Sequence, residues 1–502
     1  MPPGLSSRAA LAVLIFLAGL ALYSRNASFP ARYHPDEPDK VAQVLTRDWN
    51  FHHPLLLLQT ASVARALFSI PPETEAVVRL GRWISAAFAA GAAAFLALLA
   101  WELADPRAGL AAGLLVIVNT QFFELAHYFK EDTSLAFGTA LFAWLFTRFW
   151  GRPSILAPLA MGASLGLAAS AKYAGLSLVI LPLAILFAPG ISKPSRVVCF
   201  FLGLAAFLAV TVTVNFPMLQ MVQQAAGGIT REVEYAVDGH MGITRKIPHG
   251  VYIAVLTNAT NPGLWFLLAL YALSLVASLA PARIVPAYWR HALGCHLFKL
   301  PDYILTAFIV LTVVGFSFVP KTHHRYMLPI TGLLIVLATV AAFRPPARLI
   351  RWFTFPAMAA AILFSCLSTW DCLVAFGADT RAALQDFLKS TASPDTLIVT
   401  DRRVGLPEDF PFRTISKRFA ADAGSLADLR AAGPTLVVVT QGDFGRFLLK
   451  NHSPTGSSSP DYWRRSQFYL DLFASGELVW QREPGRLPYL QPGIRVYQLN
   501  PP

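Results

Sequence analysis

The side chains best suited to chemistry lie in one short segment, Tyr33–Lys40, which reads YHPDEPDK. It holds three carboxylates, a histidine and a lysine, and its two prolines resist regular helix. Charge is scarce elsewhere, since 14% of the residues are charged against about 25% in an ordinary soluble domain. Adjacent carboxylates can divide labour, because one can remove a proton while the other orients a group or binds a metal. We therefore expect Asp36 and Glu37 to be catalytic, with His34 beside them.

A second polar segment, His127–Thr133 (HYFKEDT), separates two apolar stretches. Asp132 could simply cap the helix that follows, where the helix dipole favours a negative charge. Helix N-termini also hold anions, so capping by one residue does not exclude a site role for its neighbours. Lys130, Glu131 and Asp132 are therefore candidate site residues.

Basic side chains suited to a phosphate occur in Lys321–Tyr326 (KTHHRY) and at Lys172. Lys and Arg bind phosphate through charge-assisted hydrogen bonds. The alternative is that these long side chains only reach toward the membrane interface. We favour phosphate or substrate binding by the following residues: Lys172, Lys321, His324, Arg325 and Tyr326.

Two consecutive histidines stand in His52-His53-Pro54. Paired histidines can bind a metal, but no further Cys or His lies at the spacing of a metal site. Positioning of the substrate or of the carboxylates is therefore the favoured role for His53. A divalent metal remains an open alternative, and no other cofactor is expected.

Long apolar stretches recur along the 502 residues, which are 55% hydrophobic with a mean hydropathy of +0.51. This composition indicates a polytopic α-helical membrane protein. The formal net charge of +12 could suggest nucleic acid, but no basic stripe with interleaved aromatic residues is present. In membrane proteins Lys and Arg collect on cytoplasmic loops and face anionic lipid, so we expect the bilayer rather than nucleic acid as the partner.

About 11 apolar spans are expected, which makes the fold class a mainly α, polytopic membrane helical bundle. The first, at roughly 8–24, is interpreted as an uncleaved helix with its N-terminus inside, because the sequence after it is a poor cleavage site. The other spans lie at roughly 82–102, 107–124, 133–150, 155–171, 173–189, 196–216, 261–281, 302–320, 326–343 and 353–376.

Charge between the spans predicts which loops share a side of the membrane. With the N-terminus inside, nearly every cytoplasmic loop carries Lys or Arg, as the positive-inside rule asks. Segments 25–80, 125–132, 217–248 and 321–325 then lie on the external face, together with all four motifs. Basic residues at 321–325 run against the rule, which suggests a local purpose such as holding a phosphate. An odd number of spans also places the C-terminus outside.

The composition changes near residue 380. Short buried strands are expected at 396–400, 435–440 and 494–499, and helices at 379–389, 426–432 and 462–473. Strands that alternate with helices indicate a small α/β domain. We therefore predict a transmembrane domain at 1–378, with a catalytic first external loop at 25–80, and an external α/β domain at 379–502.

The order of the motifs resembles the GT-C superfamily of integral-membrane glycosyltransferases. It is most similar to the branch of protein O-mannosyltransferases and the lipid A aminoarabinose transferase. That branch has an acidic motif and a His-Pro element in the first external loop, an acidic residue after the third span and a basic motif before a late span. The corresponding segments here are His34–Glu37, His53–Leu55, Lys130–Asp132 and His324–Pro329. The resemblance covers residues 1 to about 376.

The resemblance implies transfer of a sugar from a polyprenyl-phosphate carrier to an acceptor hydroxyl on the external face, with inversion at the anomeric carbon. Asp36 or Glu37 would deprotonate the hydroxyl, and nearby carboxylates would stabilise an oxocarbenium-like transition state. Glu131 or Asp132 would orient the acceptor or the sugar.

The leaving group in that reaction would be a lipid phosphate, whose charge Lys321, Arg325 or Lys172 could neutralise. The acceptor could be a protein, a glycan or a lipid. The long repeat domains of eukaryotic protein mannosyltransferases are not seen in the sequence. This favours a bacterial-type enzyme of the inner membrane, with its site on the periplasmic face.

The competing interpretation is a polytopic transporter or a lipid flippase. Transporters place ionisable groups near the bilayer midplane and often consist of two related halves. Here the ionisable groups cluster in loops on one predicted face, and no half-repeat is visible. The sequence therefore favours the enzyme.

Overall fold

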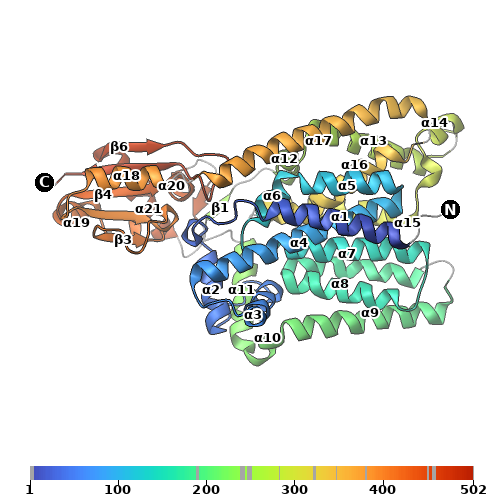
Figure 1. Cartoon of the computed structure of the whole chain (residues 1–502), viewed down its shortest axis with the longest axis horizontal. Helices are drawn as coiled ribbons and strands as arrows, with labels where there is room; N and C mark the ends of the chain where they lie inside the picture. The colour runs from blue at the N-terminus through green and yellow to red at the C-terminus, as the bar shows by residue number, and fades with distance from the viewer. Residues whose placement is uncertain are drawn as a thin grey trace.

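The computed structural model shows a long helical bundle joined to a smaller part that contains a β-sheet (Figure 1). The chain is described over residues 5–187, 191–237, 243–245, 251–281, 283–319, 324–345, 347–378, 381–448, 452–454 and 459–500. The candidate Lys321 lies outside these ranges. The prediction of a mainly helical membrane protein with a small C-terminal α/β part is confirmed.

Helices occur at every predicted span. They are α1 (Leu5–Tyr23), α4 (Thr74–Leu103), α5 (Pro106–Ile117), α6 (Thr120–Ala126), α7 (Asp132–Gly151), α8 (Ala157–Ala171), the 3-10 helix η2 (Tyr173–Phe187), α9 (Lys193–Val214), α13 (Pro262–Leu279), α15 (Leu300–Phe316), α16 (Leu328–Phe343) and α17 (Arg348–Gly377). Of the described helices, five are long and apolar enough to cross a membrane, and a bent pair makes a sixth. Shorter apolar helices cover several other predicted spans, and the total of eleven stays a prediction.

The bent pair is α5 and α6, which meet at 55°. Asn119 makes the break, because its side-chain oxygen accepts hydrogen bonds from the N–H groups of Gln121 and Phe122 and so starts a new helix. The amide of the same side chain donates to the carbonyl of Ala259 at 2.7 Å. The break directs the chain toward the polar segment 127–132 at the end of the bundle.

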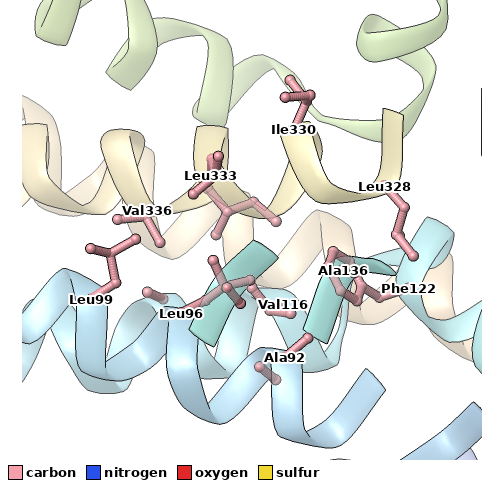
Figure 2. Close-up of a cluster of buried hydrophobic side chains, with 14 of the residues drawn as sticks. Ala92, Leu96, Leu99, Val116, Phe122, Ala136, Leu328, Ile330, Leu333 and Val336 are labelled. Carbon is pink, nitrogen blue, oxygen red and sulfur yellow. The ribbon is translucent and has the colours of Figure 1, made fainter. Parts of the chain in front are cut away.

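The core of the bundle forms where α16 lies across α4, α5 and α7. Figure 2 shows Leu328, Leu333 and Val336 of α16 facing Leu96 of α4 and their neighbours. A Cβ on Gly332 would stand 2.7 Å from a methyl carbon of Leu96. Glycine at this position therefore lets α16 approach α4 closely, which fixes the helix that follows the basic motif 324–326.

Shorter helices cover the end of the bundle that lies nearest to the sheet-containing part (Figure 1). They are α2 (Glu37–Thr46), α3 (Leu56–Leu67), α10 (Phe216–Gln220), α11 (Val222–Val237) and α12 (Val251–Ala259). Pro38 does not prevent α2, because it stands in the first turn, where a missing N–H leaves no helical bond unmade. The first helix of the catalytic loop therefore begins directly at the acidic pair.

The opposite end of the bundle carries the cations that the charge rule assigns to the cytoplasm. Arg8 and Arg148 both approach Glu102, at 2.6 and 4.0 Å. Arg344 donates to the carbonyl of Leu103 at 2.6 Å. The two predicted sets of loops thus lie at opposite ends of the molecule.

The C-terminal part has one five-stranded sheet in the order β3-β2-β4-β7-β6. The strands are β2 (Leu397–Asp401), β3 (Thr414–Lys417), β4 (Thr435–Thr440), β6 (Glu477–Arg482) and β7 (Ile494–Leu499), with helices α18 (Ala382–Thr391), α19 (Leu426–Ala431), α20 (Gln441–Leu448) and α21 (Ser459–Ser475). β2 is parallel to β3 and β4, whereas β7 is antiparallel to β4 and β6. The three predicted strands are the three central ones. The edge strands β3 and β6 were not predicted, because each is largely exposed and carries no apolar run.

A second, two-stranded sheet links the two parts of the molecule. β1 (Ile243–Arg245), from the segment after α11, pairs antiparallel with β5 (His452–Pro454) of the C-terminal part. The bundle end that carries the candidate residues therefore lies against the C-terminal part.

Candidate active site

Asp36 presents an accessible carboxylate, unlike its neighbour Glu37. It stands at the N-cap position of α2, and about half of its side-chain surface is exposed. It forms an ion pair with Lys130, which itself is buried. Partial burial acts to raise the pKa of Asp36, but Lys130, His34 and Arg325 more than offset this and hold the pKa well below its usual range. Asp36 is therefore ionised and accessible.

His34 contacts the backbone of Asp36 and is itself fully buried. Its Nδ1 accepts a hydrogen bond from the backbone N–H of Asp36 at 3.3 Å. Burial, with the positive charge of Lys130, lowers the pKa of His34 well below its ordinary value. The ring is therefore neutral with its proton on Nε2, and this nitrogen has no hydrogen-bond partner among the described residues.

Glu37 has a different environment from its neighbour Asp36. It is fully buried, and its carboxylate accepts two hydrogen bonds from Arg82, at 3.0 and 2.5 Å. A third comes from the backbone N–H of Phe129 at 2.9 Å. Arg82 also donates to the carbonyls of Ala27 and Phe29, at 2.8 and 2.6 Å. Glu37 thus fastens the catalytic loop and segment 127–132 to α4.

The other two candidate carboxylates each hold a buried lysine. Glu131 pairs with Lys40 of α2, and Asp132 pairs with Lys172 at the end of α8. All four side chains are buried. One oxygen of Asp132, Oδ2, has no hydrogen-bond partner among the described residues. Lys40, which was not among the site residues predicted from the sequence, therefore belongs to the site.

The basic motif before α16 brings further positive charge to the same place. Arg325 acts electrostatically on both Asp36 and Asp132. Lys172 Nζ lies 4.8 Å from the centre of the Tyr326 ring, a cation–π contact that joins the two basic elements. His324 turns away from this cluster, since its Nε2 lies 3.7 Å from Glu124.

The two consecutive histidines point in different directions. His53 is surrounded by cations: burial lowers its pKa well below the ordinary value, and Lys172, Lys40 and Arg325 lower it further. It is therefore neutral at the edge of the cation cluster. His52 instead contacts α11, where its Nδ1 lies 3.6 Å from Glu232.

The structure brings almost every described candidate to one end of the bundle. The members are His34, Asp36, Glu37, His53, Lys130, Glu131, Asp132, Lys172, His324, Arg325 and Tyr326. Within this set Glu37 and His324 stand apart, in contacts of their own. In such an arrangement the exposed carboxylate can accept a proton, and the buried cations can neutralise an anion.

Besides Lys40, three residues of this region were missed in the sequence. Arg82 begins a predicted span, and an ionisable residue at such a position is a signal that could have revealed it. Tyr128 and Tyr489 flank His34, with ring centres at 4.8 and 4.3 Å. Tyr489 comes from the C-terminal part, and nothing local in its sequence marks it.

Metal ligation was left open by the sequence. Among the residues that the structure describes, no three His, Cys, Asp or Glu side chains gather in a way that could hold a metal ion. His53 in particular faces lysines and an arginine.

Comparisons with known proteins bear on this site. The family model "Dolichyl-phosphate-mannose-protein mannosyltransferase" matches residues 52–216. The solved structure of ArnT from Cupriavidus metallidurans bound to undecaprenyl phosphate is 15% identical, with a TM-score of 0.55 over 98% of this chain and 97% of that one. The archaeal oligosaccharyltransferase AglB from Archaeoglobus fulgidus, in complex with an inhibitory peptide and a dolichol-phosphate, is 12% identical, with a TM-score of 0.52 over 95% of this chain and 80% of that one. The search of curated proteins finds no match.

Identities this low establish the shared fold alone, and the family model matches residues 52–216, less than half of the chain. The fold is the one predicted, with the catalytic loop, the helical bundle and a C-terminal part all covered by the alignment with ArnT. The predicted resemblance to GT-C membrane glycosyltransferases is therefore confirmed: the chain has their fold, and residues 52–216 match the mannosyltransferase family model.

Proposed function

We propose that this protein transfers a sugar from a polyprenyl-phosphate carrier to an acceptor hydroxyl, with inversion at the anomeric carbon and with Asp36 as the general base. The observation that carries the proposal is the setting of Asp36, an exposed carboxylate beside a cluster of buried cations. Glu37 is assigned a structural role, because its carboxylate is buried and already accepts three hydrogen bonds.

The proposed reaction exchanges one bond at the anomeric carbon. The acceptor oxygen bonds to that carbon while the bond from the carbon to the carrier phosphate breaks, and the electron pair leaves with the phosphate. The acceptor proton passes to Asp36. A carboxylate of low pKa is a weak base. With an oxocarbenium-like transition state, however, the attacking hydroxyl becomes acidic only late in the reaction, and a weak base is then sufficient to remove its proton.

The cation cluster supplies the other half of the chemistry. Lys172 and Arg325 would neutralise the charge that develops on the carrier phosphate, since preorganised cations act strongly where water is excluded, while Lys130 holds Asp36 ionised. Neutral His53 can donate a hydrogen bond to the phosphate or to a sugar hydroxyl, and Oδ2 of Asp132, which has no partner among the described residues, can accept one from a sugar hydroxyl. Glu131 would act through Lys40, whose position it fixes.

The donor assignment draws support from the proteins that share the fold. Both ArnT and AglB are described with a lipid phosphate bound, undecaprenyl phosphate in one and a dolichol-phosphate in the other. A lipid carrier cannot leave the bilayer, and here the candidate residues lie in loops at one end of the apolar helices. This end would be the periplasmic face of a bacterial inner membrane, with residues 379–502 as an external domain beside it.

The test is a turnover assay with purified protein in lipid vesicles. Undecaprenyl-phosphate and dolichyl-phosphate sugars would be supplied with candidate protein, glycan and lipid acceptors, and both sugar transfer and released carrier phosphate would be measured. We expect Asp36→Asn to lower transfer by about 10²–10⁴-fold, the usual contribution of a general base. A matched control is Asp371→Asn, an exposed carboxylate that pairs with Arg486. Full activity in Asp36→Asn would refute the assignment of the base.

A further inference from the structure

We propose that Arg381 is a positioning residue, through which the C-terminal domain sets Tyr489 against His34 to form the acceptor side of the active site. This inference deepens the function proposed above and rests on it. It assigns the C-terminal domain a direct part in the reaction, by a side chain that contacts the catalytic loop.

The buried side chain of Arg381 connects two loops of the C-terminal domain, one at residues 403–404 and the other at residues 489–490. It is fully buried just before α18, and its guanidinium donates to four backbone carbonyls. Two belong to Val404 and Arg403, at 2.8 and 2.9 Å, and two to Leu490 and Tyr489, both at 2.8 Å. A planar fork with five N–H donors can hold two loops at once, which a lysine cannot do.

The same guanidinium also contacts the catalytic loop. Its central carbon lies 4.0 Å from the centre of the Tyr33 ring, which is a cation–π distance. Tyr33 directly precedes His34 in the chain. A single side chain therefore sets the loop that carries Tyr489 relative to the loop that carries Asp36.

Further contacts fix the same interface. Arg32 donates from Nε to the carbonyl of Gly405 at 2.9 Å, and Arg402 pairs with Asp39 at 2.9 Å. Gly405 has a φ of +64°, and a Cβ there would stand 3.1 Å from the carbonyl oxygen of Arg32. The positive φ and the close carbonyl oxygen both favour glycine at position 405. The C-terminal domain is held against residues 32–39 by contacts on both sides of Arg381.

These contacts place the side chain of Tyr489 at the site. Its ring lies 4.3 Å from that of His34 and 5.7 Å from that of Tyr128, and it is only partly buried. His34 in turn accepts the N–H of Asp36. Tyr489 therefore stands next to the proposed base and keeps a surface that a substrate can contact.

The position of Tyr489 points to the acceptor rather than the donor. The donor phosphate is assigned to Lys172 and Arg325 of the bundle, and Tyr489 lies against His34 and within electrostatic reach of Arg325, between the proposed base and the donor cations. Tyr489 comes from the domain that lies beyond the bundle end (Figure 1). In an inverting displacement the acceptor and its base lie on the face of the sugar opposite the leaving group. A side chain of the C-terminal domain beside Asp36 would therefore contact the acceptor. Aromatic rings of this kind present a broad apolar face with a polar edge, which suits sugar rings and peptide groups.

The test separates the acceptor from the donor and compares four variants: Tyr489→Ala, Tyr489→Phe, Arg381→Ala and Arg381→Lys. We expect Tyr489→Ala to raise the KM for the acceptor at least tenfold and the KM for the donor much less. Tyr489→Phe keeps the ring and should retain most activity. Arg381→Lys should act like Tyr489→Ala, and Arg464→Lys, at a surface ion pair with Asp422, is the matched control.

A second measurement does not depend on turnover. Hydrogen exchange of peptides that cover residues 28–36 should speed up in Arg381→Ala and Arg381→Lys, because Tyr33 loses its cover, and should not change in Arg464→Lys. If exchange and acceptor KM both stay unchanged in the Arg381 variants, the positioning role is wrong. If the unaltered protein transfers no sugar, the proposed function fails, and hydrogen exchange still decides whether Arg381 holds the catalytic loop.

Discussion

Asp36 and Glu37 are adjacent in the chain, yet the fold gives them opposite surroundings. The sequence could nominate the pair from the scarcity of charge and from the flanking prolines, but it left the two unranked. Ranking them requires Arg82, which approaches from α4 and takes Glu37 out of solvent contact. Local sequence holds no information on that approach, because it depends on how the loop packs on the helix.

The structural role of Glu37 leads to a prediction on stability. Glu37→Gln leaves the buried Arg82 charge without its partner, and breaking a buried pair costs about 3–5 kcal/mol. We expect a clearly lower unfolding temperature in detergent, with activity lost in proportion to the folded fraction. Asp36→Asn, at a half-exposed position, should unfold close to the unaltered protein. Loss of activity in Glu37→Gln without loss of stability would mean that Glu37 takes part in the chemistry.

The protonation states of the site predict the pH dependence of transfer. The pKa of Asp36 is lowered, so its carboxylate persists above that pKa and, on the acid side, activity falls only when the pH drops well below 4. The pKa values of His34 and His53 are also lowered, so both rings stay neutral near pH 6.5. We therefore expect neither Asp36 nor the two histidines to change charge between pH 5.5 and 8. Burial lowers the pKa of Lys40 to about 7, so Lys40 loses its charge as the pH rises through this range, and kcat/KM should fall on the alkaline side. A tenfold rise over that range, with an apparent pKa near 6.5, would assign the base to a histidine instead.

At the scale of elements, sequence periodicity predicted the positions of the helices well, but it predicted what each helix contributes to the site only in part. The apolar stretches and central strands follow directly from hydrophobic runs. The two prolines of Tyr33–Lys40 were expected to resist regular helix, but Pro38 stands in the first turn of α2, where proline is compatible with a helix. The lysine–carboxylate pairs join residues far apart in the chain, such as Lys40 and Glu131. Such pairing follows from the packing of α2 on the bundle and leaves no periodic signal.

Helix α11 provides a test of how the external segments pack. A Cβ on Gly228 would stand 2.7 Å from the carbonyl oxygen of Phe51, just before the two histidines, whereas a Cβ on Gly227 would meet nothing within 4 Å. Gly228→Ala should therefore displace segment 50–53 at a cost of about 1–3 kcal/mol and lower transfer, while Gly227→Ala should behave like the unaltered protein. Transfer rates and thermal unfolding of the two variants check this. Equal behaviour of both would contradict the contact between α11 and the loop.

At the scale of the whole molecule, the site lies between a helical bundle and a C-terminal domain that follows the catalytic loop only after several hundred residues of sequence. Motif order sufficed to predict the bundle and the class of enzyme, because the four motifs all belong to loops of the bundle. It could not predict that Tyr489 contacts His34, since that contact depends on how the C-terminal domain docks.

The docking makes the topology of the protein testable. The C-terminal domain contacts the catalytic loop, so both must lie on the same side of the membrane. We expect a tag after residue 502 to be reached by protease or antibody from outside in intact spheroplasts, as should a tag inserted after residue 70. A cytoplasmic tag at the C-terminus would contradict the interface described here.

The pairing of each buried lysine with its own carboxylate has a consequence for engineering and for evolution. Removal of Lys172 alone would leave Asp132 as an uncompensated buried charge, and removal of Lys40 would do the same to Glu131. Single substitutions at these positions therefore lower stability before they can alter the choice of donor. A change of donor preference at this site would have to proceed by joint replacement of both members of a pair, or through Arg325 and His53.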